Sequence, residues 1–316
     1  MATVSRVLNG SCNVSDESTK KVNETIARLN YSPNFLGRNL RKCETNVILV
    51  IMPTSEHSLY SKIVMGMQEY AGKVGYDIIT AVSYSTSTAE TRQMNMLFNR
   101  TVDGVILLGT QYDADSLNKL AENYNVALCC EGVKGANVLT VAVDDEQAAF
   151  DAVAALIKKG HKRIGFIGTN SSAISSTARE NGYIRALKEY GIEIKNEYIY
   201  KESYDYDCGG RAFEYFNALA EKPTAIFAVS DLLAISAMHK AIDMGIDVGK
   251  DVAIMGFDNI SMCEWIIPTL STVEQPCSKM GELVVAKLIE NMNKTTKDNH
   301  YYTVDHRIIL RESTGD

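Results

Sequence analysis

The chain has 316 residues, 46% of them hydrophobic and 22% charged, which is ordinary globular composition and enough for two or three domains. The longest apolar run, residues 47–52, is too short to span a bilayer, and residues 1–30 lack an export pattern, so we predict a cytoplasmic protein without a membrane partner. The net charge of −7 is uneven: residues 1–45 hold seven Lys/Arg and four acids, or +3, and the remainder carries −10. A basic head on an acidic body predicts a small nucleic-acid-binding segment beside a larger domain.

The seven cysteines and five histidines show no ligand-like pattern. The cysteines are scattered and odd in number, and neither a C-x-x-C pair nor zinc-like spacing with histidine occurs. We therefore predict reduced cysteines, no metal site and no cofactor.

The head contains two amphipathic helical segments. In both, apolar residues recur at the spacing of one helix face: Val4, Val7 and Leu8 in the first, and Val22, Ile26 and Leu29 in the second. Ser15 can cap the second helix, with Asp16 and Glu17 in its first turn. Pro33 begins a further short basic segment.

The sequence of the body predicts alternating strands and helices. Strand-like runs occur at 46–52, 76–82, 103–109, 125–130, 138–143, 162–168, 197–202, 225–230 and 251–257. Between most of them lie helical stretches, such as 59–73, 147–159, 177–190 and 232–244, and Gly160, Gly191 and Gly245 stand where left-handed helix ends are expected. Apolar strands alternating with helices predict parallel sheets buried on both faces. Nine strands exceed one ordinary sheet, so we predict two α/β subdomains that divide near residues 143–145.

Familiar enzyme motifs are missing from this sequence. The first strand leads into Pro53 and His57 without the glycines of a dinucleotide-binding turn, and GxxxxGK[ST], GxSxG and HExxH do not occur. We therefore predict that the chain is not an enzyme.

The head resembles the DNA-binding head of the LacI/GalR family of bacterial transcription regulators. The resemblance is carried by MATVSRVLNG followed by VSDESTKKVNETIARLNYSPNFLGRNLR. In that family a helix-turn-helix places TVSRVLN in the major groove, and the YxPN…AxxL segment forms a hinge helix in the minor groove. The resemblance implies a partial helix-turn-helix head at 1–33 and a hinge helix and linker at 34–45.

The same resemblance assigns DNA contacts. Met1, Ala2 and Arg6 match base-facing positions, and arginine reads guanine well. Thr3 and Ser5 carry hydroxyls suited to phosphates. Leu40 matches the hinge leucine that wedges between base pairs, with Arg38 and Arg41 beside it for phosphates. The remaining predicted contacts in these motifs are Asn9, Tyr31 and Asn34.

The head departs from the family in one respect. The family carries about 15–20 residues before this point, including the first helix of the helix-turn-helix, and Met1 here aligns just inside the recognition helix. Two explanations stay open: a misplaced start codon, or a natural variant without that helix. A head reduced in this way is expected to be marginally stable.

The body resembles the same family's effector-binding core, which has the type I periplasmic-binding-protein fold. The resemblance is carried by VDGVILLG, VDDEQAAFDAV, GHKRIGFIG, RENGY and DVAIMGFDN, and it is nearest to the catabolite-control branch. It implies an N-terminal effector subdomain at 46–143 plus 276–302 and a C-terminal one at 144–275 plus 303–316. A ligand is expected between them, beyond the carboxyl ends of the strands.

The implied effector contacts combine charged, aromatic and hydroxyl groups. Arg179 and Asp258 match an arginine and an acid that bind ligand hydroxyls or an anionic group. The other positions are Tyr204, against a sugar face, Asp231, at the cleft edge, and Ser58 and Tyr60, in a loop that departs from the family's usual NPFF. Structural alternatives stay open: Arg179 pairing with a carboxylate, Asp258 capping a turn and Tyr204 packing. His57 is at least as well explained as a solvated loop residue.

The resemblance implies a homodimeric repressor that binds a double-stranded DNA operator. A small effector, a sugar or sugar phosphate, would close the cleft and order or melt the hinge. Two rivals remain: a regulator switched by a phosphorylated carrier protein, and a sugar-binding sensor that does not bind DNA. The sequence does not determine the effector, the sign of its effect, the operator or the choice between dimer and tetramer.

Overall fold

The computed structural model describes Val4, Arg6 and Val7, and residues 14–29, 44–170, 173–294 and 297–316. Its contacts divide the chain into a head, Met1–Thr45, and a body, Asn46–Asp316. Most predicted DNA contacts lie outside the described residues: Met1, Ala2, Thr3, Ser5, Asn9, Tyr31, Asn34, Arg38, Leu40 and Arg41. The predicted boundary between residues 33 and 34 lies outside them as well.

The described part of the head is helical. Val4, Arg6 and Val7 have helical geometry, and α2 spans Asp16–Leu29. The Ser15 hydroxyl accepts the Ser18 N–H at 3.4 Å, and Asp16 and Glu17 lie in the first turn, as the sequence predicts. No residue of α2 is buried against the described part of the chain, and Leu29 is 66% exposed.

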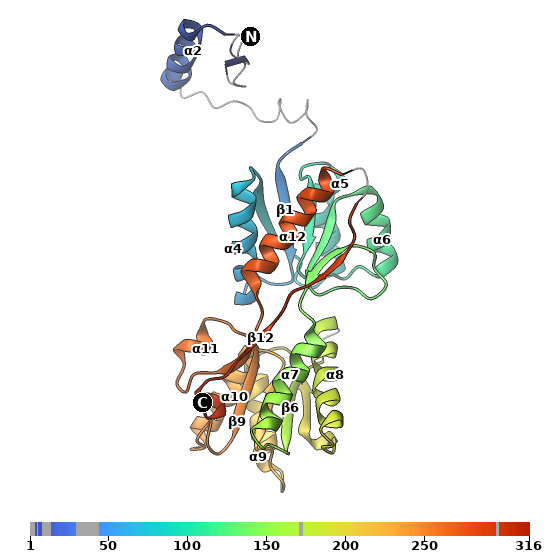
Figure 1. Cartoon of the computed structure of the whole chain (residues 1–316), viewed down its shortest axis with the longest axis vertical. Coiled ribbons are helices and arrows are strands. Elements are labelled where there is room, and N and C mark those ends of the chain that lie inside the picture. Colours follow the sequence, from blue (N-terminus) through green and yellow to red (C-terminus); the bar gives the residue numbers. More distant parts are fainter. Residues whose placement is uncertain (1–3, 5, 8–13, 30–43, 171–172, 295–296) are drawn as a thin grey trace. The chain divides into compact units, whose positions relative to one another are not determined.

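The first lobe of the body is a six-stranded parallel sheet with helices on both faces. Its strands are β1 (Val47–Met52), β2 (Asp77–Val82), β3 (Gly104–Leu107), β4 (Val126–Cys130), β5 (Leu139–Ala142) and β11 (Tyr301–Thr303), in the order β11-β5-β4-β3-β1-β2. Its helices are α4 (Ser58–Lys73), α5 (Ser87–Phe98), α6 (Ala114–Asn123) and α12 (Cys277–Met292). Figure 1 shows α4 and α12 side by side and α6 on the far side of the sheet.

The second lobe repeats this plan. Its strands are β6 (Ile164–Thr169), β7 (Ile199–Glu202), β8 (Ala225–Ala228), β9 (Ala253–Asp258), β10 (Ser271–Glu274) and β12 (Arg307–Ile309), in the order β12-β10-β9-β8-β6-β7. Only β12 pairs antiparallel, against β10, among the pairs that join these strands. Its helices are α7 (Asp145–Lys158), α8 (Ile174–Glu189), α9 (Tyr206–Ala218), α10 (Asp231–Asp243) and the short α11 (Met262–Trp265). Short 3-10 turns at Asn196–Tyr198 and Glu312–Thr314 complete it.

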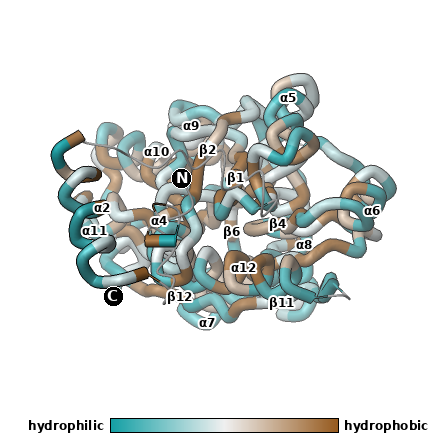
Figure 2. Tube along the Cα trace, turned by 90° about the horizontal axis from the view of Figure 1, so that it is seen from above, coloured by the Kyte–Doolittle hydropathy of each residue, from teal (hydrophilic) through white to brown (hydrophobic). Residues whose placement is uncertain are grey.

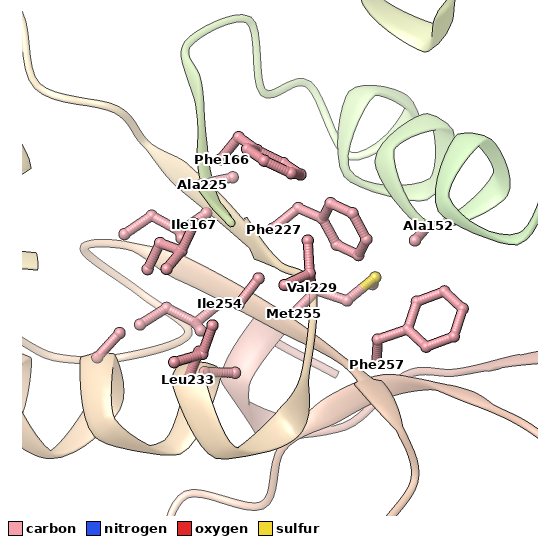
Figure 3. Close-up of a cluster of buried hydrophobic side chains, with 14 of the residues drawn as sticks. Ala152, Phe166, Ile167, Ala225, Phe227, Val229, Leu233, Ile254, Met255 and Phe257 are labelled. Carbon is pink, nitrogen blue, oxygen red and sulfur yellow. The ribbon is translucent and has the colours of Figure 1, made fainter. Parts of the chain in front are cut away.

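The strands are buried on both faces because their apolar side chains alternate between two cores. In β1, Ile48 and Val50 pack with α4 and α12, whereas Leu49 and Ile51 pack on the opposite face. In the second lobe, Phe227 and Phe257 lie on the side of Ala152, while Leu233 lies across the sheet (Figure 3). Figure 2 shows hydrophobic residues along the central strands and hydrophilic residues on outer helices. Burial of these side chains is the main stabilising contribution to each lobe.

The two lobes are joined by residues 143–144, 275–276 and 304–306, which lie between β5 and α7, β10 and α12, and β11 and β12. Each lobe is therefore built from discontinuous segments. Thr303 belongs to the first lobe's β11, one residue beyond the predicted 276–302 segment. The predicted glycine ends are confirmed, with φ of 98° at Gly160, 66° at Gly191 and 74° at Gly245.

No helix among the described residues combines the length and the apolar character needed to cross a bilayer.

Candidate functional site

A cavity of about 560 Å³ lies where the two lobes meet. Its walls come from the loops that follow the strands of both sheets, which is where ligands bind in doubly wound α/β proteins. The first lobe contributes the segments after β1, β2, β3 and β4, and the second contributes residues after β6, β7, β8, β9 and β10. The topology therefore brings polar side chains from distant parts of the sequence to one place.

Arg179 and Asp258 both line this cavity, as the sequence predicts. Arg179 lies on α8; its Nε donates to Asp145 Oδ1 at 2.8 Å and its Nη1 donates to the Val229 carbonyl at 2.6 Å. Nη1 lies 3.5 Å from Asp258 Oδ1, and the guanidinium stacks on the Phe257 ring with 3.6 Å from Cζ to the ring centroid. Arg179 thus pairs with a carboxylate, as the alternative to a ligand contact expected, and it also lines the cavity.

The RENGY sequence explains how Arg179 is held. Gly182 lets α8 approach α7, because a Cβ at this position would lie 2.2 Å from the Glu146 carbonyl oxygen. Tyr183 is fully buried, and its hydroxyl donates to the Ile164 carbonyl at 2.8 Å. Arg179 therefore contacts the cavity, Gly182 allows close helix packing and Tyr183 anchors α8 to β6.

The Asp145 carboxyl is the charge partner of Arg179. It sits in the first turn of α7, where a negative charge is favourable. Burial raises the pKa of Asp145 to about 6, although Arg179 opposes this shift. The pair therefore holds most of its charge near neutral pH inside the protein.

Asp258 ends β9 with an unusual backbone conformation. Its φ is 118°, and the pocket-lining residues Cys130 and Ser85 also have positive φ, at 81° and 53°. Non-glycine residues rarely adopt such angles, and each costs on the order of 1–3 kcal/mol. Gln275 Nε2 donates to Asp258 Oδ1 at 2.7 Å and fixes the carboxylate direction. Strain at three loops around one cavity is typical of a binding site.

His57, which the sequence left open between a solvated loop position and a ligand contact, lines the cavity. Its Nδ1 accepts the Leu59 N–H at 3.3 Å and so caps α4. Its Nε2 lies 3.6 Å from Asp258 Oδ2, and its ring stacks on Tyr204 with centroids 6.0 Å apart. Tyr60 and Tyr204 both line the cavity as predicted. Burial raises the pKa of the Tyr60 hydroxyl, which therefore remains a hydrogen-bond donor.

Two predicted effector contacts lie outside the cavity lining. Asp231 is fully buried; Oδ1 accepts the Thr272 hydroxyl at 2.5 Å and Oδ2 accepts the Ile260 N–H at 2.8 Å. Its carboxylate therefore holds the loop after β9 rather than facing a ligand, and Ser230 beside it lines the cavity. Ser58 is exposed at the start of α4, while its neighbour His57 points inward. In both cases adjacent residues at the start of a helix point in different directions, so that one lines the cavity and its neighbour does not.

Several polar residues of the cavity belong to no motif identified in the sequence. Glu90 on α5 accepts the Thr110 hydroxyl at 2.5 Å and the Gln111 N–H at 2.8 Å. Glu131, directly after β4, accepts the Ser175 N–H of the other lobe at 3.1 Å. Placement after a predicted strand was the available hint for Glu131, whereas Gln275 follows β10, which the sequence did not predict. Across the described residues, no group of three or more His, Cys, Asp or Glu side chains is arranged to hold a metal ion.

Of the predicted DNA contacts, Arg6 lies within the described residues. It has helical geometry and is exposed, so its side chain is available to a ligand.

Comparison with known proteins relates both parts of the chain to bacterial regulators. Residues 1–34 match the family described as "Bacterial regulatory proteins, lacI family", and residues 153–314 match "Periplasmic binding protein-like domain". The chain is 37% identical to Catabolite control protein A of Priestia megaterium over 316 residues, covering 99% of this chain and 95% of that protein. It is 30% identical to the HTH-type transcriptional repressor CytR of Escherichia coli strain K12, with 99% and 92% covered.

A solved structure, the transcriptional regulator CelR–cellobiose complex, superposes with a TM-score of 0.77 at 26% identity and covers 99% of this chain and 95% of its own. Two matching family models and relatives at 30% identity or more over nearly their whole length agree with the two-lobed body and the helical head. The chain belongs to the lacI family of bacterial regulatory proteins and is a transcription regulator rather than an enzyme.

Proposed function

We propose that this regulator is a homodimeric repressor whose binding to operator DNA is controlled by a small hydroxylated effector, a sugar or close relative, in the cavity between the lobes. The observation that carries the proposal is the buried Arg179–Asp258 pair facing a cavity of about 560 Å³. This volume lies within the range of small-molecule sites. The likeness to a regulator solved with cellobiose supports a saccharide as the ligand class.

The lining suits a molecule with several hydroxyl groups. Asp258 offers a carboxylate acceptor, Arg179 offers donors, and charge-assisted hydrogen bonds of this kind are stronger than neutral ones. Tyr204 lines the cavity and is 43% exposed, so that part of its aromatic ring is available to a sugar ring beside its contact with His57. Tyr60 adds a hydroxyl donor. The cavity therefore combines a few directed polar groups with flat apolar surface.

Ligand binding at this place would act on the arrangement of the two lobes. Direct contacts already join the two lobes: Lys62 Nζ donates to the Asn259 carbonyl at 2.8 Å, and Glu131 accepts from Ser175. A ligand touching both lobes stabilises one of their arrangements according to its differential affinity. We propose that this change orders or melts the hinge at 34–40, so that effector and operator affinities are linked.

For the DNA interface we propose the contacts that the sequence predicts. Arg6 would read a base edge, with Met1 and Ala2 beside it, and Leu40 would enter the minor groove. Two heads in a dimer would then match a palindromic operator.

The body offers an apolar face for a second copy of the chain. Met262, Trp265 and Ile267, on and after α11, are 43%, 76% and 88% exposed, and Met65 of α4 is 67% exposed. Figure 1 shows α4 and α11 on the same side of the body. Because exposed aromatic and aliphatic side chains gathered on one side are typical of interfaces, we propose that this face forms the dimer contact.

The proposal is tested by operator release in a mobility-shift assay. The DNA is the chromosomal region beside the protein's own gene, and a panel of sugars and sugar phosphates is titrated against the complex. At least one compound should change DNA affinity and raise Tm. Arg179→Lys keeps the charge but cannot contact Asp145, Val229 and Asp258 together, so it should weaken the response about tenfold or more.

Arg92→Ala, which removes an exposed arginine of α5, is the matched control and should leave the response unchanged. If no compound acts while DNA binds, the alternative of a phosphorylated carrier protein as corepressor is favoured. If sugars bind and DNA does not, the chain is a sensor without operator binding.

A further inference from the structure

The cavity carries an excess of negative charge. Among its described lining residues, Glu90, Glu131 and Asp258 are acids and Arg179 is the single Lys or Arg. The charge of Arg179 is already met by Asp145 at 2.8 Å and by Asp258 at 3.5 Å. An anionic ligand would therefore compete with two internal carboxylates for one guanidinium.

Glu131 places a further carboxylate where an anion would otherwise bind. The N-terminus of α8 points to the cavity, and the free N–H groups of a helix N-terminus favour phosphate. Here Glu131 Oε2 accepts the Ser175 N–H of that first turn at 3.1 Å. A phosphate at this place would have to displace the carboxylate and would be repelled by it.

A second cavity continues the acidic character. About 290 Å³ in volume, it adjoins the first at Glu131, Ile174 and Ser175, which line both. Its lining also includes Asp144, Asp145 and Glu146, and none of its described lining residues is Lys or Arg. Asp145 pairs with Arg179 and Glu146 pairs with Arg185, so among the described residues Glu131 and Asp144 are the acids of this lining that pair with no arginine. Both sides of the Glu131 carboxylate are thus unfavourable to anions, whereas hydroxyl and ammonium groups find acceptors there.

We propose that the effector is a hydroxylated molecule without an anionic group, a neutral saccharide or an amino sugar, and that Glu131 is the residue that rejects phosphorylated analogues. This inference rests on the proposed function and narrows its ligand class. Glu131 acts as a specificity-determining residue: it donates nothing to an anion and accepts hydrogen bonds from hydroxyl or ammonium groups. Arg179 and Asp258 bind hydroxyl groups of the effector. Together the two side chains carry no net positive charge that would attract an anion.

The test uses the full chain and thermal unfolding with matched ligands. Glucose, glucosamine and glucose 6-phosphate form one series, and galactose, galactosamine and galactose 6-phosphate form another. Inorganic phosphate is titrated against sodium chloride of equal ionic strength. The variant is Glu131→Gln, whose amide oxygen can still accept from Ser175. Glu122→Gln, on the exposed face of α6, removes the same charge elsewhere.

In the wild-type chain and Glu122→Gln, the phosphate esters and inorganic phosphate should leave Tm unchanged. The neutral sugar or the amino sugar of at least one series should raise Tm. The one that does so shows whether the effector is a neutral saccharide or an amino sugar. In Glu131→Gln, the affinity for the phosphate ester relative to the parent sugar should increase about tenfold or more, because one opposing charge is lost. Inorganic phosphate should also raise the Tm of this variant.

Two results would overturn the inference. One is a wild-type chain that binds a phosphate ester as tightly as the parent sugar. The other is a Glu131→Gln chain as insensitive to phosphate as the wild type. If no sugar of any charge raises Tm or releases DNA, the proposed effector function loses its support. The inorganic phosphate titration still decides whether Glu131 rejects anions.

Discussion

Arg179 is a charged residue that the protein surrounds with its own counterions. Its side chain is 11% exposed, and that of Asp145 is 8% exposed. Two hydrogen bonds and the Phe257 ring fix the guanidinium before any ligand arrives. Such preorganisation reduces the entropy that a ligand must overcome on binding. The arrangement also makes Arg179 structurally important.

Removing this cation should destabilise the body. Arg179→Ala leaves Asp145 and Asp258 buried without their partner, so the free energy of unfolding should fall by about 3–5 kcal/mol. Arg179→Lys should cost less, because one charge contact survives. Urea unfolding followed by circular dichroism measures both. A loss below 1 kcal/mol in Arg179→Ala would show that water compensates the two carboxylates.

The buried carboxyl group of Asp231 should make the stability of the folded chain depend on pH. Burial, with a contribution from Asp258, raises the pKa of Asp231 to about 7, against an ordinary value near 4. Between about pH 4 and 7 the folded chain retains a proton that the unfolded chain releases, so the free energy of unfolding falls as pH rises. Asp231→Asn should flatten this slope, although Asp145 contributes in the same direction.

Urea unfolding at intervals from pH 4 to 8 measures the slope. Asp243→Asn, which changes an exposed residue at the end of α10, should behave as the wild type. An equal slope in Asp231→Asn and the wild type would assign the dependence to other groups.

For single residues, the sequence predicts which members of a recognisable motif reach the cavity better than it predicts which residues beside the motif do so. Arg179, Asp258, Tyr60 and Tyr204 reach the cavity because they follow strands or lie in a helix that faces it. Asp231 could not be excluded, since its burial depends on Thr272, forty-one positions away along the chain.

Among the elements, pairs of helices approach closely through glycine. In α4 and α12, a Cβ at Gly66 would lie 2.3 Å from the Ser278 carbonyl oxygen, and one at Gly281 would lie 2.2 Å from that of Ile63. In α9 and α10, a Cβ at Gly209 would lie 2.0 Å from the Leu233 carbonyl oxygen. Close packing leaves no room for added atoms, so these positions set the helix spacing.

Two glycines of one helix allow a matched test. Gly66→Ala should lower the free energy of unfolding by about 2–3 kcal/mol, because α4 and α12 must separate. Gly72→Ala, with no heavy atom within 4 Å of the new Cβ, should raise it by about 0.5 kcal/mol by favouring helix. Chemical denaturation of both variants measures the difference. Equal effects would show that contact with α12 does not limit position 66.

The elements themselves were predictable where the signal is local. The nine expected strands all form, because runs of Val and Ile suit strands buried on both faces. Strands β10, β11 and β12 were not predicted, since they are short and lack the continuous apolar runs that mark most of the other strands. Their pairing depends on long-range partners, and a local pattern does not encode those.

For the whole molecule, the proposed dimer face is the exposed apolar surface around α11. Ile267→Ser combined with Trp265→Ser removes two side chains that are mostly exposed in one chain, so the fold should survive. The dimer dissociation constant should rise about tenfold or more, as expected for large apolar residues at an interface. Analytical ultracentrifugation measures it.

Ile242→Ser, which alters another partly exposed apolar residue, on α10, should leave the dissociation constant unchanged. A double variant that dimerises like the wild type would place the interface elsewhere.

The discontinuous lobes also constrain synthesis of the protein. The first lobe needs α12 and β11, so it cannot be completed until residues 277–303 have left the ribosome. The second lobe needs β12, and Ser313, whose hydroxyl donates to the Ile254 carbonyl at 2.6 Å. Neither lobe can therefore mature during most of translation, and nascent strands with exposed apolar faces are prone to aggregation. Production of this regulator should depend on chaperones that hold the nascent chain until its last forty residues, from α12 onward, emerge.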